Sequence, residues 1–231
     1  MIEVLSFDLD GTLVDTGGEI AAAVNDTLRD FGLAPRAQAE IEALVGAGAH
    51  ALMRRLLTRV QAPRLPDTAA VLHCFEQHYA AHAGTAARPY PGCADALARL
   101  HAAGVRMACV TNKEQRHARR VLEACALAPY FTLLIGGDTL PFKKPDARVL
   151  RHVVATLGSV PARAAHVGDS ETDLVAARSA GVADWAVPWG YNAGVSVVQA
   201  RPSRLFDSFA DIAEAVLAPS TVPARRAAGL H

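Results

Sequence analysis

The chain has 231 residues, of which 51% are apolar and 20% charged, the balance of a soluble globular protein rather than a disordered one. Basic and acidic side chains number 23 each, so no net charge attracts nucleic acid or an anionic membrane. The start of the chain lacks the pattern of a secretion signal, and no apolar run reaches the roughly 20 residues of a membrane span. We therefore expect a cytoplasmic monomer or homodimer without nucleic-acid or membrane partners.

The first predicted element is a strand, because residues 2–9 (IEVLSFDL) are rich in β-branched and aromatic side chains and have no helical period. The pattern then becomes helical. Apolar residues three and four apart predict four helices, with Gly32 as the stop of the first and Asp67 as the N-cap of the fourth. We expect these helices to form a small cap over residues 16–84.

From residue 85 onward, strands and helices alternate. Strands are predicted at 105–112, 131–138, 164–170 and 183–190, with helices between them and a last short helix at 208–218. This alternation implies right-handed crossovers and a parallel, doubly wound sheet that the first strand joins. The predicted fold class is therefore α/β, with a core of residues 1–15 and 85–218 and a helical insertion after the first strand. Residues 219–231 have no core-forming pattern and are expected to be a flexible tail.

Lysine is rare in this arginine-rich chain. Only three of the 23 basic residues are lysines, Lys113, Lys143 and Lys144, and they fall in two short stretches. A compact ammonium group is therefore indicated at these places. The four cysteines have neither a CxxC pair nor zinc-ligand spacing, which favours reduced thiols over a metal or disulfide role.

Polar residues follow each of the predicted strands. Ligands of open parallel sheets bind at the carboxyl ends of the strands, so these residues are the candidates for a binding site. They are Asp8 and Asp10; Thr111 and Asn112; Asp138, Lys143 and Lys144; and Asp169 and Asp173. The set suits a metal ion together with a phosphate group, whose oxygens the Thr111 hydroxyl and the Lys144 ammonium could hold.

Three of these carboxylates indicate the metal. Asp8 and Asp10 are two residues apart and share one face of the strand, while Asp169 comes from another strand end. Carboxylates that converge without a counter-charge raise one another's pKa, and Mg²⁺ resolves the conflict best because it takes one or two carboxylates together with substrate phosphate. Gly11 permits a tight turn and is expected to leave amide N–H groups facing an anion.

Four ordered motifs carry a family resemblance: DLDGTLVDT, VTN, KKPD and GDSETD. They resemble the motifs of the haloacid dehalogenase superfamily of phosphotransferases, and the helical insertion resembles that family's cap. More narrowly, GAGAHALMRRLL, YPG and WGYN (Trp189 to Asn192) resemble bacterial phosphoglycolate phosphatases. The resemblance implies an enzyme that hydrolyses a small phosphorylated metabolite, with 2-phosphoglycolate as the leading substrate.

The resemblance also implies roles for the residues. Asp8 would attack phosphorus and form an aspartyl-phosphate, and Asp10 would protonate the leaving oxygen and later activate water. Mg²⁺ would lie between the Asp8 carboxylate, the Asp10 backbone carbonyl, Asp169 and the phosphate. The residues that would hold the phosphoryl group are Gly11, Thr111, Asn112 and Lys144. Asp173 would orient the groups around the metal and the phosphate. The cap residues that would select the substrate are Gly46, Gly48 and His50.

Other interpretations remain open. A sugar-phosphate mutase of the same superfamily would pass the phosphoryl group to a hydroxyl instead of water. A non-enzymatic phosphorylation switch would use similar groups in a different order and without a cap. A dehalogenase is disfavoured because halide departure needs no acid at the position of Asp10.

Several neighbouring residues are expected to have structural roles. We interpret Lys143 as a surface charge, Asp138 as a loop or capping residue, and Asp15 as a hinge residue or helix cap. Arg54 and Arg55 are expected on a helix surface, and Glu19 has no assigned role.

Overall fold

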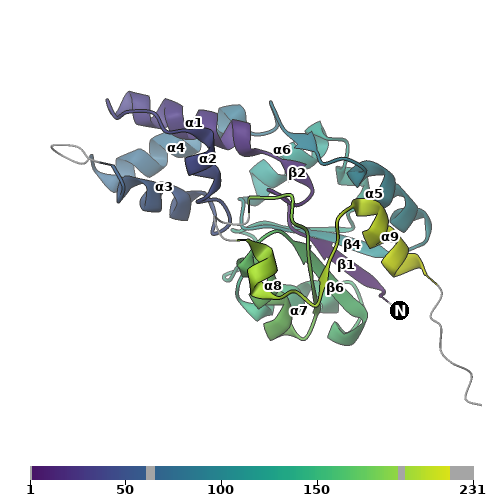
Figure 1. Ribbon diagram of the computed structural model, residues 1–231. Helices are drawn as coiled ribbons and strands as arrows, with labels where there is room; N and C mark the ends of the chain where they lie inside the picture. Colours follow the sequence, from purple (N-terminus) through teal and green to yellow (C-terminus); the bar gives the residue numbers. More distant parts are fainter. Residues whose placement is uncertain (1, 61–65, 192–195, 219–231) are drawn as a thin grey trace, which may run out of the picture.

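A computed structural model describes residues 2–60, 66–191 and 196–218 (Figure 1). Six parallel strands form one sheet in the order β5-β4-β1-β6-β7-β8. Their bounds are β1 (Val4–Phe7), β4 (Arg106–Val110), β5 (Leu133–Ile135), β6 (Ala164–Gly168), β7 (Ala183–Ala186) and β8 (Arg204–Leu205). The chain adds β4 and β5 on one side of β1 and then β6, β7 and β8 on the other, so the strand order reverses at β1. This is the predicted doubly wound α/β fold.

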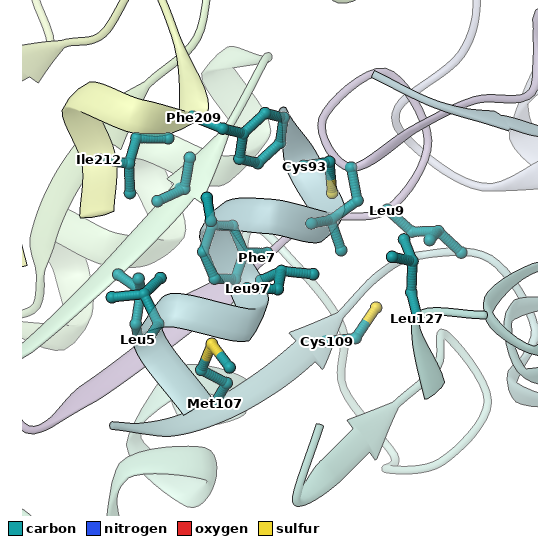
Figure 2. Close-up of a cluster of buried hydrophobic side chains, with 14 of the residues drawn as sticks. Leu5, Phe7, Leu9, Cys93, Leu97, Met107, Cys109, Leu127, Phe209 and Ile212 are labelled. Carbon is teal, nitrogen blue, oxygen red and sulfur yellow. The ribbon is translucent and has the colours of Figure 1, made fainter. Parts of the chain in front are cut away.

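Helices cover both faces of the sheet because strand residues alternate between two apolar clusters. Leu5 and Phe7 point into the cluster that Figure 2 shows, together with residues of α5 (Cys93–Ala102), α6 (Gln115–Ala124) and α9 (Phe209–Leu217). Val4, one residue out of phase, packs in a second cluster with α7 (Ala147–Thr156) and α8 (Glu171–Ala180). Asp8, Thr111 and Asp169 directly follow β1, β4 and β6, so the candidate site lies at the carboxyl ends of these strands.

The cap has an apolar core of its own. It consists of α1 (Gly17–Asp30), α2 (Gln38–Glu42), α3 (Ala49–Leu57) and α4 (Thr68–His82), which lie to one side of the sheet in Figure 1. Sixteen buried side chains among the described residues of this segment form one cluster, separate from those of the sheet. Asp67 caps α4 by accepting a hydrogen bond from the Ala70 amide at 3.0 Å, as the sequence predicts.

The two crossings between core and cap are paired with each other. Strand β2 (Val14–Asp15) leaves the core and lies antiparallel to β3 (Arg88–Pro89), which returns to it. These two-residue strands and β8 are too short to show a period in the sequence, and they were not predicted. Short 3₁₀ segments complete the described structure: Ala128–Tyr130, Pro161–Arg163 and Val197–Ala200.

The predicted tail, residues 219–231, lies outside the described residues, as does Asn192 of the WGYN motif. Among the described helices, none combines the length and apolar character that crossing a bilayer requires. The cytoplasmic location and the oligomeric state stay predictions.

Candidate active site

The candidate nucleophile is buried beside a lysine. Asp8 directly follows β1, and its carboxylate Oδ1 lies 2.9 Å from the Nζ of Lys144, which comes from the loop before α7. The same Nζ lies 2.6 Å from Oδ1 of Asp173, and the side chains of Lys144 and Asp173 are 2% and 1% exposed. Three segments that are distant in sequence therefore bring one ammonium between two carboxylates.

The pKa values of Asp8, Asp173 and Lys144 are shifted in different directions or by different causes. Burial raises the pKa of Asp8 to about 7, and the neighbouring Lys144 charge limits the rise. Burial also disfavours the charged form of Asp173, but the Lys144 charge and hydrogen bonds from His166 and Lys144 outweigh it, so the pKa of Asp173 lies below its usual range. The pKa of Lys144 is raised, because the two carboxylates outweigh its desolvation. Asp173 is thus the fixed anion of the group and Asp8 the more basic one.

Asp173 is held in place by several donors. It is the N3 residue of a capping box at the start of α8, where it accepts from the Ser170 hydroxyl at 2.6 Å and the Ser170 amide at 3.2 Å. Its other oxygen lies 3.2 Å from Nε2 of His166, a buried residue of β6. These contacts orient Asp173 toward Lys144, and its role in orienting the rest of the site stays a prediction.

An acidic cluster that fits a divalent cation lies at the same place. Oxygen atoms of Asp8, Asp169 and Asp173 all lie within 4.8 Å of one another. The backbone comes close to Asp169: a Cβ on Gly11 would lie 2.5 Å from its Oδ2, and one on Gly190 would lie 2.3 Å from the same atom. Buried carboxylate oxygens at this spacing, with glycines that leave room around one of them, form a donor set suited to Mg²⁺.

Gly11 lies in the turn after β1. Its amide donates to the Val14 carbonyl at 3.0 Å and closes this turn. The N–H of Gly11 itself therefore bonds within the turn, and the expectation that amide N–H groups of this turn face an anion stays a prediction. Gly11 is required here because its φ of +81° disfavours side chains, and because Asp169 occupies the space where a Cβ would lie.

Asp10 is held by two donors on one oxygen. Its Oδ1 accepts from the Thr16 hydroxyl at 2.7 Å and from Lys113 Nζ at 2.8 Å. Lys113 also lies 3.7 Å from Glu19 Oε1 in the cap, and its side chain is 1% exposed. Sequence reasoning noticed that lysine is concentrated here but assigned no role to Lys113 or Glu19.

A pocket lies between the strand ends and the cap. Asp8, Asp10, Thr111, Asn112 and Lys113 line its core side. The cap side is mainly apolar, and the residues that line it are Ile20, Val45, Gly46, Gly48, Ala49, Leu52, Phe75 and Tyr79. The pocket therefore joins a charged floor to an apolar wall.

Asn112 links the cap loop to the core. Its Nδ2 donates to the Gly46 carbonyl at 3.0 Å and to the Lys144 carbonyl at 2.9 Å. Gly48 lies next to this link, since a Cβ there would be 3.0 Å from the Asn112 carbonyl oxygen. Lys143, interpreted as a surface charge, donates to the Ala47 carbonyl at 3.1 Å and thus also contacts the cap. Hydrogen bonds from Asn112 and Lys143 therefore hold the cap loop that contains Gly46 and Ala47 against the core.

Two other candidates, His50 and Asp138, do not line this pocket but line a neighbouring one that shares Ala49 and Asn112 with it. His50, a candidate for substrate selection, is exposed and lies 2.7 Å from Glu76 through its Nε2, and it does not line the pocket described above. Asp138 accepts from the Gln115 amide at 2.7 Å at the start of α6, which is a capping contact.

Tyr191 contacts the segment at residues 15–17, where the chain passes from the core into the cap. In the sequence this tyrosine was noted only as part of the WGYN motif. Tyr191 accepts from the Thr16 amide and donates to Oδ1 of Asp15, both at 2.7 Å. Asp15 also accepts from the Gly17 amide at 3.1 Å. The predicted hinge residue Asp15 is thus tied to the segment after β7.

The fold and this strand-end site define a class of hydrolase. The model of the haloacid dehalogenase-like hydrolases matches residues 5–187, and the chain belongs to this family.

Its relatives include phosphatases. A phosphoglycolate phosphatase 1 of Pseudomonas aeruginosa is 39% identical over 90% of this chain and 78% of its own length. A phosphoglycolate phosphatase of Agrobacterium fabrum is 37% identical over 91% of this chain and 90% of its own. A crystal structure of a predicted phosphoglycolate phosphatase from Haemophilus somnus superposes with a TM-score of 0.89 at 31% identity and covers 93% of this chain and 97% of that one.

Proposed function

We propose that this protein hydrolyses a small phosphate monoester, with 2-phosphoglycolate as the leading substrate. The observation that carries the proposal is the buried Asp8 carboxylate beside Lys144, with Asp10 in the same pocket under the cap. The names of the curated relatives support the choice of 2-phosphoglycolate.

Asp8 is the proposed nucleophile. One of its oxygens forms a bond to phosphorus while the bond from phosphorus to the leaving oxygen breaks, which gives an aspartyl-phosphate. Lys144 is placed to offset negative charge on Asp8 and on the phosphoryl group. Water then attacks the same phosphorus, inorganic phosphate departs, and Asp8 is regenerated as a carboxylate.

Asp10 is the proposed acid and base. It gives a proton to the leaving oxygen in the first step and takes one from the attacking water in the second. Thr16 and Lys113 both bind Oδ1, and no donor to Oδ2 is found among the described residues. We therefore assign the proton transfers to Oδ2.

Magnesium is the proposed cofactor. Both oxygens of Asp173 accept hydrogen bonds from protein groups, so the Asp8 and Asp169 carboxylates and the Asp10 backbone carbonyl are the proposed ligands. When bound, the ion supplies positive charge that offsets the charge of the phosphoryl oxygens.

The pocket favours a small leaving group. Leu52 and Phe75 of the cap close it with apolar surface, and Gly48 and Ala49 bring the N-terminal end of α3 to its edge. That helix end carries a partial positive charge, which suits an anionic group on the substrate.

A screen of phosphorylated metabolites with added Mg²⁺ tests the proposal. We expect release of inorganic phosphate, fastest from 2-phosphoglycolate, and no release with Asp8→Asn. Product analysis in the presence of a sugar bisphosphate tests the mutase alternative. Transfer of the phosphoryl group without free phosphate would contradict hydrolysis.

A further inference from the structure

Lys113 is a buried cation that contacts both parts of the molecule. It follows β4, and its Nζ lies 2.8 Å from Oδ1 of Asp10 in the core and 3.7 Å from Oε1 of Glu19 in the cap. It also lies over the ring of Tyr79 of α4, 4.8 Å from the ring centroid. Two of its three contacts therefore come from the cap.

Glu19 is anchored where the chain crosses between core and cap. It lies in the first turn of α1, directly after the outgoing crossing, and its side chain is fully buried. Its second oxygen, Oε2, accepts from the Gly84 amide at 2.9 Å, and Gly84 precedes the returning strand β3. A movement of the cap about these crossings would thus displace the carboxylate that faces Lys113.

The buried charge of Lys113 depends on carboxylates from both the core and the cap. A buried ammonium is costly unless carboxylates compensate it, and here the compensation comes from Asp10 and Glu19 together. Burial alone would lower the pKa of Lys113, but the charges of the Asp10 and Glu19 carboxylates outweigh burial and raise it. One of the two carboxylates that compensate Lys113 therefore belongs to the core and the other to the cap.

We propose that Lys113 is a positioning residue that fixes the Asp10 carboxylate for proton transfer, and that Glu19 makes this fixation depend on the seated cap. The inference rests on the proposed function, in which Asp10 protonates the leaving oxygen. Thr16, beside the outgoing crossing, binds the same oxygen of Asp10. Donors tied to the hinge therefore hold Oδ1 while Oδ2 remains for the substrate.

The test compares two substrates whose leaving groups differ in their need for a proton. 2-Phosphoglycolate releases an alkoxide and depends on Asp10, whereas 4-nitrophenyl phosphate releases a stable phenolate. We expect Lys113→Met to lower kcat for 2-phosphoglycolate about 10²-fold, the low end of a general acid's contribution, and for the aryl ester less than about threefold. Asp10→Asn should show the same split and serves as the benchmark.

Glu19→Gln isolates the cap side of the proposal, because it removes the charge and keeps the shape. We expect a loss of about tenfold on 2-phosphoglycolate alone, roughly 1.4 kcal/mol at tenfold per 1.36 kcal/mol. The double variant Lys113→Met with Glu19→Gln leaves no unpaired charge on Glu19 and should lose no more than Lys113→Met alone. Arg119→Ala, an exposed cation on α6, is the matched control and should change neither rate.

The outcomes separate this inference from the proposed function. If the wild type hydrolyses neither ester, the proposed function fails. If Asp10→Asn shows the split but Lys113→Met slows both esters equally, or slows neither, Lys113 does not position the acid and the inference is overturned. Should Lys113→Met not fold, the double variant gives the same comparison without the buried charge.

Discussion

The catalytic end of the sheet and the cap bury their residues by opposite means. At the sheet, Asp8, Lys144 and Asp173 are buried as charges, and each depends on partners more than twenty residues away in sequence. In the cap, helices bury apolar residues at a regular spacing, and the resulting cluster includes Leu52 and Phe75, which also line the pocket. We therefore expect the core to supply the reacting groups, and the cap to supply substrate fit, closure and the Glu19 carboxylate that faces Lys113.

The largest expected effect comes from removing the nucleophile. Asp8→Asn should lower kcat by at least about 10⁴-fold on alkyl and aryl esters alike, as loss of a covalent nucleophile does in other enzymes. The measurement is steady-state phosphate release. A thermal unfolding midpoint close to that of the wild type controls for folding. Turnover that survives the substitution would contradict the mechanism.

Lys144→Met should have the next largest effect. It removes the charge facing the nucleophile, for which we expect a loss of about 10²–10³-fold in kcat. It also leaves Asp8 and Asp173 buried without their cation, which should lower the free energy of unfolding by about 3 kcal/mol. Urea unfolding and phosphate release measure the two losses.

Arg148→Met is the control for Lys144→Met, since Arg148 is exposed: it forms an ion pair with Asp146 and lies over the ring of Phe142, 4.5 Å from the ring centroid. It should cost less than about 1 kcal/mol. Equal destabilisation by the two substitutions would show that the buried cluster contributes no more than a surface pair.

A cap substitution should leave the core folded. Phe75 is 1% exposed and stacks on Tyr79 with ring centroids 5.3 Å apart. Phe75→Ala should destabilise the cap by about 3 kcal/mol. Hydrogen exchange should show lost protection in α1 and α4 and retained protection in β1 and β4. His73→Ala, at an exposed position of α4, is the control. Equal loss of protection in the sheet would mean that cap and core unfold as one unit.

The smallest predicted effect concerns the contact between cap and core. His117 of α6 packs against Tyr79, with ring centroids 4.9 Å apart, and burial lowers the pKa of His117 to about 4. Since an unfolded histidine titrates near 6.5, the unfolded chain binds more protons between these values, and stability must fall as pH falls from about 6.5 toward 4. We expect about 2 kcal/mol of stability to be lost between pH 7 and pH 5.

His117→Gln provides the comparison for this pH effect. Urea unfolding at the two pH values should show a smaller loss for the variant than for the wild type. An identical loss in both proteins would assign the pH dependence to other groups, such as the buried His166, whose pKa is also lowered by burial.

The sequence predicts the core residues of the site because the geometry of a parallel sheet is general. All strand ends meet at one edge, so Asp8, Thr111 and Asp169 could be expected near one another without knowledge of any side-chain contact. The cap helices could be predicted from their apolar spacing because the period of an α-helix is equally general.

The sequence does not predict what depends on loop geometry. Lys113 lies two residues beyond Thr111 in a loop, and its direction toward Asp10 and Glu19 depends on where α1 begins relative to β4. The hydrogen bond from the Gly11 amide to the Val14 carbonyl was not expected either, because this turn has no separate sequence signal. In both places the position of a group is set by contacts within or between loops, which the sequence pattern does not reveal.

A covalent phosphoryl group on residue 8 is the central claim, and chemical trapping tests it most directly. Enzyme quenched during turnover of 2-phosphoglycolate and reduced with borohydride should contain homoserine at position 8, detectable by peptide mass spectrometry. Aspartate at position 8 in every peptide, or homoserine at position 10 or 169 instead, would contradict the account.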